Sequence, residues 1–172
     1  WQRNITNHLL TSLQDTPVVV LQGARQTGKS TLAQILGELG HLATYLTMDN
    51  ITTLVAVQQD PVGFLEGLGQ QNVILDEIQR VHELFLPLKA AVDRDRRPGR
   101  FLLTGSANAL LLPRLAETLV GRMEVLTLWP LAQCEIDTTP NDWIDRIFAA
   151  EPLPVQQFAS SRQDVMRRGL HG

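Results

Sequence analysis

The segment from Gly23 to Ser30 constrains the fold of this chain more than any other stretch. It reads G-x-x-x-x-G-K-S, the pattern of a loop that cradles phosphate groups. The apolar run 17–22 precedes it, and residues 31–36 follow with the spacing of a helix. Strand, glycine-rich loop and helix in this order form the setting that the pattern requires, which favours a phosphate loop over a chance glycine turn before a helix.

Each residue type in the loop suits this chemistry. Gly23 and Gly28 permit backbone angles and close approaches that a Cβ atom would block. Lys29 offers a mobile positive charge to the β- and γ-phosphates, and the Ser30 hydroxyl can ligate Mg²⁺. The residues expected to contact the nucleotide are Gly23, Ala24, Arg25, Gln26, Thr27, Gly28, Lys29, Ser30 and Thr31.

Hydrophobic patterning predicts an α/β fold, because apolar strands alternate with segments of helical spacing. A parallel sheet with helices on both faces follows from this alternation, and ligands then bind at the carboxyl ends of the strands. The expected strands are 18–22, 42–48, the apolar run 72–77 that ends in two acids, 101–106 and 123–128. The expected helices are 3–13, 29–39, 50–71 in pieces, 84–94, 108–119 and 141–150.

Two aspartates have the sequence context of helix caps. Asp60 precedes Pro61, which suits an N-cap followed by proline at the first helical position. Asp49 closes the second expected strand, and we expect it to cap the helix that follows.

Asp76 and Glu77 end the apolar run V-I-L-D-E. An aspartate in this position can hold Mg²⁺ directly or through water, and the alternative is a helix cap. The neighbouring Glu77 can orient or deprotonate the water that attacks a γ-phosphate, which favours hydrolysis over phosphate transfer to an acceptor; the alternative is a solvated surface acid.

Three polar residues, Thr104, Ser106 and Asn108, end or follow the strand expected at 101–106. One of them could bond the γ-phosphate or the attacking water, or they could be strand-end hydroxyls and a helix cap. Arg122 precedes the last strand. It could stabilise a transferring phosphoryl group from a neighbouring subunit, or it could form a structural ion pair.

Composition bounds the remaining possibilities. A chain of 172 residues can bury one domain core. Its net charge of −3 gives no overall reason to bind nucleic acid or an anionic membrane. The single cysteine, Cys134, suits a reducing compartment, and no apolar run approaches the ~20 residues of a membrane span.

Five segments of the chain match a known family. They are G-A-R-Q-T-G-K-S-T-L (23–32), L-D-E-I-Q-R (75–80), residues 88–108, L-V-G-R (119–122) and L-W-P-L (128–131). In these segments the chain resembles a prokaryotic family of AAA-type P-loop ATPases whose C-terminal half is a domain of unknown function. The resemblance implies a five-stranded sheet in the order 5-1-4-3-2, ATP and Mg²⁺ as ligands, and a cytoplasmic setting. It implies Lys29 and Ser30 as the Walker A pair, Asp76 and Glu77 as the Walker B pair, and Ser106 or Asn108 as the sensor.

The predicted organisation is an ATPase domain over 1–135 and an extension over 136–172 that leads towards an absent C-terminal domain. The predicted function is that of an ATP-binding and ATP-hydrolysing core of a larger protein, with a homo-oligomer left open. The alternative is a switch that binds ATP, hydrolyses it negligibly and signals through the C-terminal domain.

Overall fold

A computed structural model describes residues 3–106, 111–137 and 148–149 of the chain. The chain divides into two compact units, one formed by Ile5–Trp129 and one by Trp1–Asn4 together with Pro130–Gly172. The larger unit contains the sheet and the candidate site. In the parts of the chain that are described, no helix combines the length and the apolar character needed to cross a bilayer.

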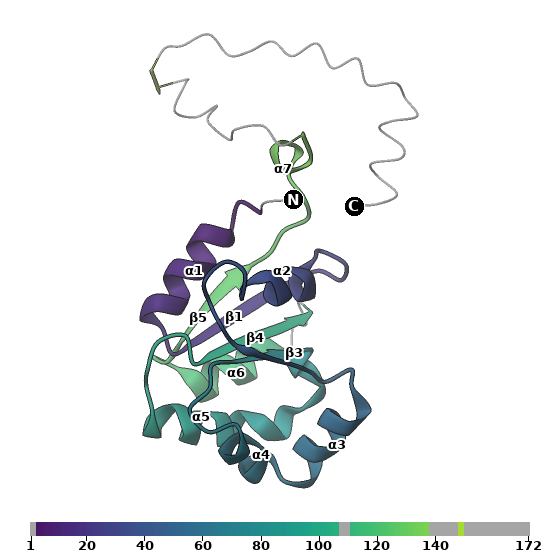
Figure 1. Cartoon of the computed structure of the whole chain (residues 1–172), viewed down its shortest axis with the longest axis vertical. Coiled ribbons are helices and arrows are strands. Elements are labelled where there is room, and N and C mark those ends of the chain that lie inside the picture. Colours follow the sequence, from purple (N-terminus) through teal and green to yellow (C-terminus); the bar gives the residue numbers. More distant parts are fainter. Residues whose placement is uncertain (1–2, 107–110, 138–147, 150–172) are drawn as a thin grey trace. The chain divides into compact units, whose positions relative to one another are not determined.

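The larger unit is built on a five-stranded sheet whose observed pairs are all parallel (Figure 1). Its order is β2-β3-β4-β1-β5, which read from the other edge is the predicted 5-1-4-3-2. The α/β fold and the strand order are therefore confirmed. The strands are β1 (Val18–Gly23), β2 (Thr44–Thr47), β3 (Val73–Asp76), β4 (Phe101–Ser106) and β5 (Met123–Thr127).

The central strands are apolar on both faces, which places one hydrophobic cluster on each side of the sheet. Val18 and Val20 face one cluster, while Val19 and Leu21 face the other. Two helices, α1 and α2, cover one face, and α3 to α6 cover the other (Figure 1). The helices of this unit are α1 (Thr6–Asp15), α2 (Lys29–Ile35), α3 (Ile51–Gln59), α4 (Pro61–Gly67), α5 (Phe85–Arg94) and α6 (Leu111–Leu119), with 3-10 turns η1 (Ile78–Arg80) and η2 (His82–Leu84).

Cap assignments made from sequence are half right. Asp60 caps α4 as predicted, since its Oδ1 accepts a hydrogen bond from the Gly63 amide at 2.8 Å. Asp49 was wrongly predicted to cap α3: the N-cap is Asn50, whose Oδ1 accepts from two amides of the first turn. Asp49 instead pairs with Arg80, with an N–O distance of 2.6 Å. The predicted helix at 141–150 falls almost wholly outside the described residues.

The smaller unit is described mainly through α7 (Gln133–Asp137). Glu135 is its buried acid, and it accepts hydrogen bonds from the backbone amides of Asn4 at 2.6 Å and Ala132 at 2.8 Å. Burial alone would favour the neutral carboxyl, but these amides and Arg3 hold the pKa of Glu135 below its usual value. The predicted boundary between residues 135 and 136 stays a prediction.

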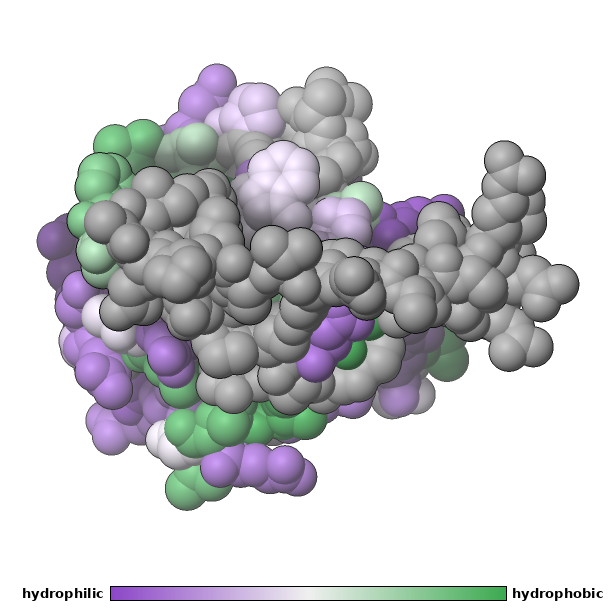
Figure 2. All heavy atoms as spheres, turned by 90° about the horizontal axis from the view of Figure 1, so that it is seen from above, coloured by the Kyte–Doolittle hydropathy of each residue, from purple (hydrophilic) through white to green (hydrophobic). Residues whose placement is uncertain are grey.

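The surface of the described residues mixes polar and apolar side chains. Figure 2 shows one face, on which hydrophobic and hydrophilic residues lie interspersed. Exposed apolar side chains such as those of Ile51 and Leu86 are ordinary on folded proteins, because polar side chains alone cannot cover a protein surface.

Candidate nucleotide-binding site

The phosphate loop joins the end of β1 to the start of α2, as the motif requires. Gly28 has φ 88° and ψ 22°, a left-handed conformation that favours glycine. Gly23 is needed for a different reason: a Cβ atom there would lie 2.4 Å from the backbone oxygen of Leu128. Gln26 is also left-handed, with φ 64°, which is uncommon for a residue with a side chain.

Lys29 is held inside this loop. Its ammonium donates hydrogen bonds to the carbonyl oxygens of Ala24 at 2.6 Å and Gly23 at 3.1 Å. Burial lowers the pKa of Lys29, and the negative charges of Glu77 and Asp76 partly oppose that effect. The positive charge therefore stays within the loop without a carboxylate bonded to it, in a position to meet an incoming phosphate.

Asp76, the last residue of β3, lies at the centre of a group of hydroxyl donors. It is only 4% exposed. Its Oδ1 accepts from Ser30 Oγ at 3.1 Å and from Thr104 Oγ1, and its Oδ2 accepts from the Tyr45 hydroxyl at 2.5 Å. Three elements, α2, β2 and β4, thus bring hydroxyl donors to one carboxylate at the end of β3.

Tyr45 is the member of this group that sequence reasoning missed. It lies on β2 opposite Ile74, two residues before the position opposite Asp76. Burial and the bonded carboxylate raise the pKa of Tyr45 to about 12, so the phenol is a donor at neutral pH. The sequence feature that could have indicated it is a tyrosine within an expected apolar strand, since a buried tyrosine hydroxyl usually needs a hydrogen-bond partner.

Glu77 follows directly and has a left-handed backbone, with φ 58° and ψ 40°. Non-glycine residues in this region are uncommon and often belong to functional sites. Its carboxylate accepts a hydrogen bond from Gln79 Nε2, a second contact that sequence reasoning missed. The other side-chain atom of that amide, Gln79 Oε1, is buried without a hydrogen-bond partner.

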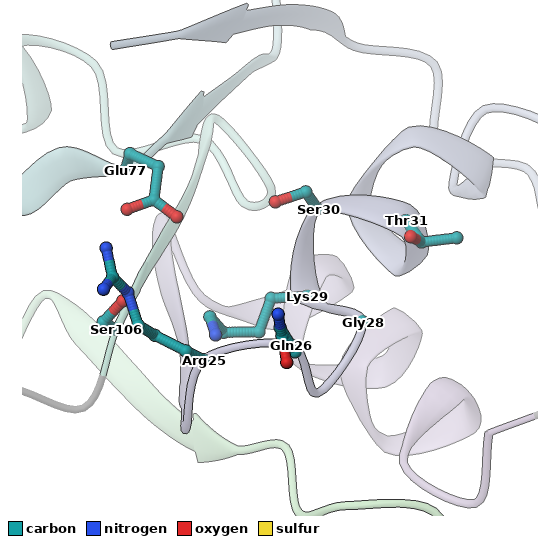
Figure 3. A pocket seen from close by; sticks show the side chains of 8 residues that line it. All are labelled: Arg25, Gln26, Gly28, Lys29, Ser30, Thr31, Glu77 and Ser106. Atoms are coloured by element: carbon teal, nitrogen blue, oxygen red, sulfur yellow. The ribbon is translucent and has the colours of Figure 1, made fainter. Parts of the chain in front are cut away.

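A cavity of about 530 Å³ opens between the loop and the ends of β3 and β4, within the usual size range of ligand pockets (Figure 3). It brings together the loop, the acid Glu77 and the sensor candidate Ser106. Asn108, the other sensor candidate, lies outside the described residues. The lining residues are Arg25, Gln26, Gly28, Lys29, Ser30, Thr31, Glu77 and Ser106.

Arg122 lies at the amino ends of the parallel strands, whereas this cavity lies at their carboxyl ends. It precedes β5, whose five residues span about 17 Å at ~3.3 Å each. Its guanidinium donates from Nε to Asp93 Oδ1 at 2.6 Å and from Nη2 to Asp93 Oδ2 at 3.1 Å, and these bonds lower the pKa of Asp93. Arg122 therefore forms an ion pair with Asp93 within the chain, which was one of the two alternatives drawn from the sequence. A role of Arg122 across a subunit interface remains a hypothesis.

The oxygen atoms at the cavity suit a hard cation. The Ser30 hydroxyl and the Asp76 carboxylate lie 3.1 Å apart and are both oxygen donors, the kind that Mg²⁺ prefers. The site therefore fits the predicted metal, and these two residues would hold it.

Comparisons with known proteins agree with this geometry. The family described as AAA domain matches residues 15–137. Two uncharacterized proteins, from Mycobacterium bovis and Mycobacterium tuberculosis, are each 34% identical to this chain over 164 residues. The match covers 95% of this chain and 36% of each relative, so the chain spans about a third of the length of the curated relatives it matches.

Among solved structures, a Walker-type ATPase of Pyrococcus abyssi superposes with a TM-score of 0.54 and 18% sequence identity. The superposition covers 88% of this chain and 59% of that one, and it supports the fold alone. The family match extends over most of the chain and includes the phosphate loop, the Asp76–Glu77 pair and all five strands. The chain therefore belongs to the AAA domain family of P-loop ATPases.

Proposed function

We propose that this domain binds Mg·ATP and hydrolyses it as the core of a larger protein. The observation that carries the proposal is the single cavity in which Lys29, Ser30 and Glu77 meet, with Asp76 bonded to Ser30 behind it. A cation, a pair of metal-binding oxygens and an acid that can act on water are the parts that phosphoryl transfer to water requires.

Each residue has a distinct task in this proposal. The loop amides and Lys29 bind the β- and γ-phosphates, and Ser30 with Asp76 holds Mg²⁺. When bound, Mg²⁺ neutralises charge on the phosphate oxygens. Glu77 orients a water molecule and accepts its proton as the water oxygen bonds to the γ-phosphorus. The bond to the bridging oxygen breaks, which leaves ADP and inorganic phosphate.

One observation favours the second candidate, a nucleotide-dependent switch with negligible hydrolysis. The Glu77 carboxylate is engaged by Gln79 Nε2, so one of its oxygens is occupied before any nucleotide arrives. If that bond persists when ATP binds, Glu77 is a poor base and the domain holds ATP without cleaving it.

The remainder of the protein is part of the proposal. The chain covers 36% of the length of each curated relative. We propose that a C-terminal domain, a homo-oligomeric state or both receive the effect of ATP binding. We further propose a cytoplasmic location, where ATP is available. Net charge gives no indication of a nucleic-acid partner.

Two variants of the full-length protein test the proposal. Lys29→Ala should lose at least tenfold in affinity for both ATP and ADP, because a charge-assisted contact is worth about 1.5–3 kcal/mol. Glu77→Gln should bind Mg·ATP like the parent and turn over at least ~10²-fold more slowly. Glu83→Gln, the same change at an exposed acid outside the cavity, is the control.

Calorimetry and a phosphate-release assay separate the two candidates. If the parent protein binds ATP but releases phosphate no faster than Glu77→Gln, the switch is correct. Unchanged nucleotide affinity in Lys29→Ala would contradict both.

A further inference from the structure

We propose that Arg25 is a catalytic residue that contacts the γ-phosphate of the nucleotide bound to its own chain, an inference that rests on the proposed function. Arg25 is the third residue of the phosphate loop, and its side chain lines the same cavity as Glu77 and Ser106. In Figure 3 the Arg25 guanidinium extends away from the loop towards those two residues.

The charge of Arg25 is not neutralised by a carboxylate. Within the described ranges Arg25 is exposed and has neither a hydrogen bond nor an ion pair to its guanidinium. Six other arginines of the same unit each lie within 4 Å of a carboxylate oxygen: Arg80, Arg94, Arg96, Arg97, Arg100 and Arg122. Arg25 therefore stands apart as a cation that faces a phosphate cavity without a protein anion bonded to it.

Its position in the cavity selects the phosphate that it meets. Ser30 lines the part of the cavity next to Asp76, where the metal and the β-phosphate would lie. Glu77 marks the side from which water attacks, which is the side of the terminal phosphate. Because Arg25 points towards Glu77, its contact is with the γ-phosphate, and ADP lacks this contact.

The guanidinium is suited to the reaction as well as to binding. Its planar fork can donate two parallel hydrogen bonds to phosphate oxygens, which a lysine ammonium cannot do. As the bond from the γ-phosphorus to the bridging oxygen breaks, charge builds on the transferring group and its leaving oxygen, and a cation held there lowers the barrier. Since Arg25 belongs to the loop itself, this stabilisation requires no neighbouring subunit.

The test compares Arg25→Ala, Arg25→Lys and the control Arg96→Ala in the full-length protein. Arg96 is exposed and pairs with Asp93 outside the cavity. Calorimetry measures affinity for ATPγS and for ADP, and phosphate release is measured over a wide range of protein concentration. Arg25→Ala should lose about tenfold or more in ATPγS affinity and keep its ADP affinity within about twofold.

Turnover should show whether Arg25 stabilises the transition state in addition to binding the nucleotide. We expect kcat to fall about 10³-fold in Arg25→Ala, the scale of an arginine that stabilises this transition state. Arg25→Lys should recover ATPγS affinity more than kcat, since it keeps the charge and loses the fork. The parent rate per chain should not change with protein concentration.

Several outcomes would overturn the inference. Equal losses for ATPγS and ADP would make Arg25 a general loop residue, and unchanged affinity and kcat would make it a surface side chain. Either result leaves the proposed function standing if Lys29→Ala still weakens the binding of both nucleotides at least tenfold. A parent protein that binds neither nucleotide would end both proposals.

Discussion

Replacing Tyr45 with phenylalanine tests whether the hydroxyls of Ser30, Tyr45 and Thr104 stabilise Asp76 as described. The substitution removes one oxygen and keeps the ring, so the packing of β2 is preserved. It takes from Asp76 Oδ2 the donor that lies 2.5 Å away in the parent chain. Because Asp76 is only 4% exposed, water replaces that donor poorly.

The magnitude follows from the kind of bond that is lost. A hydrogen bond to a charged group contributes about 1.5–3 kcal/mol to stability. Tyr45 is half-buried, so screening by solvent favours the lower end, about 1.5 kcal/mol. For a chain of 172 residues each kcal/mol shifts Tm by ~2–4 °C, and Tyr45→Phe should therefore melt about 3–6 °C below the parent.

The assay also has a pH dependence of known sign. The native pKa of Tyr45 is raised to about 12 from 10.0, which means that folding favours the neutral phenol. Its contribution to the free energy of unfolding is complete below pH 10 and is lost as the pH rises towards 12. Across that window the parent should lose stability more steeply than Tyr45→Phe.

Tyr45 is the only tyrosine of the chain, so phenolate absorbance reports its pKa directly. A native pKa near 10, or a Tyr45→Phe variant with the Tm of the parent, would refute the reasoning.

Two further predictions concern positions away from the cavity. Asn50→Ala should lower the free energy of unfolding by about 1 kcal/mol, because it removes the cap of α3. Asp49→Ala removes only a half-exposed ion pair and should cost less than Asn50→Ala in the same denaturant titration. Arg122→Ala should leave ATP affinity and kcat unchanged if the ion pair is its whole role. Hydrolysis that rises more than linearly with protein concentration, and that Arg122→Ala loses but regains when mixed with Glu77→Gln, would instead establish a role in trans.

Much of the fold could be predicted because each buried strand is visible in the sequence as a short apolar run. The four apolar residues from Val18 to Leu21 are buried on both faces, and a parallel strand of this kind leaves an apolar run that needs no tertiary information. Helix starts are harder to predict. Asp49 and Asn50 are adjacent and both can cap, so the choice depends on where the chain leaves β2 and not on residue type.

Within the site, the sequence indicated the residues that belong to local motifs. It missed those whose side chains contact the motif residues from elsewhere in the fold. Lys29, Ser30 and Asp76 belong to patterns with fixed spacing. Tyr45 and Gln79 do not: Tyr45 reaches Asp76 from a neighbouring strand, and Gln79 reaches back to Glu77, whose backbone is left-handed. Neither the register of two strands nor a single backbone angle is written in residue spacing, so both contacts required the structure.

The hydrogen-bond donors around Asp76 are all hydroxyls, and this affects how the carboxylate can bind a metal. A buried carboxylate is costly unless it is paired or hydrogen-bonded. Here its donors are the neutral hydroxyls of Ser30, Thr104 and Tyr45, and not an arginine or lysine. Hydroxyls stabilise the carboxylate without cancelling its charge, so the full negative charge remains available to a divalent cation.

This arrangement predicts that Mg²⁺ stabilises the chain even without nucleotide. At a free Mg²⁺ concentration of ten times Kd the gain is about 1.4 kcal/mol, or ~3–6 °C in Tm. Asp76→Asn should lose this gain and yet, in the absence of Mg²⁺, be at least as stable as the parent, because the hydroxyls can bond the amide and no charge is buried. Asp15→Asn, an exposed aspartate, should respond to Mg²⁺ like the parent. If Asp76→Asn responds to Mg²⁺ like the parent, the cation binds elsewhere. The three hydroxyls would then serve only to stabilise the buried carboxylate in the folded chain.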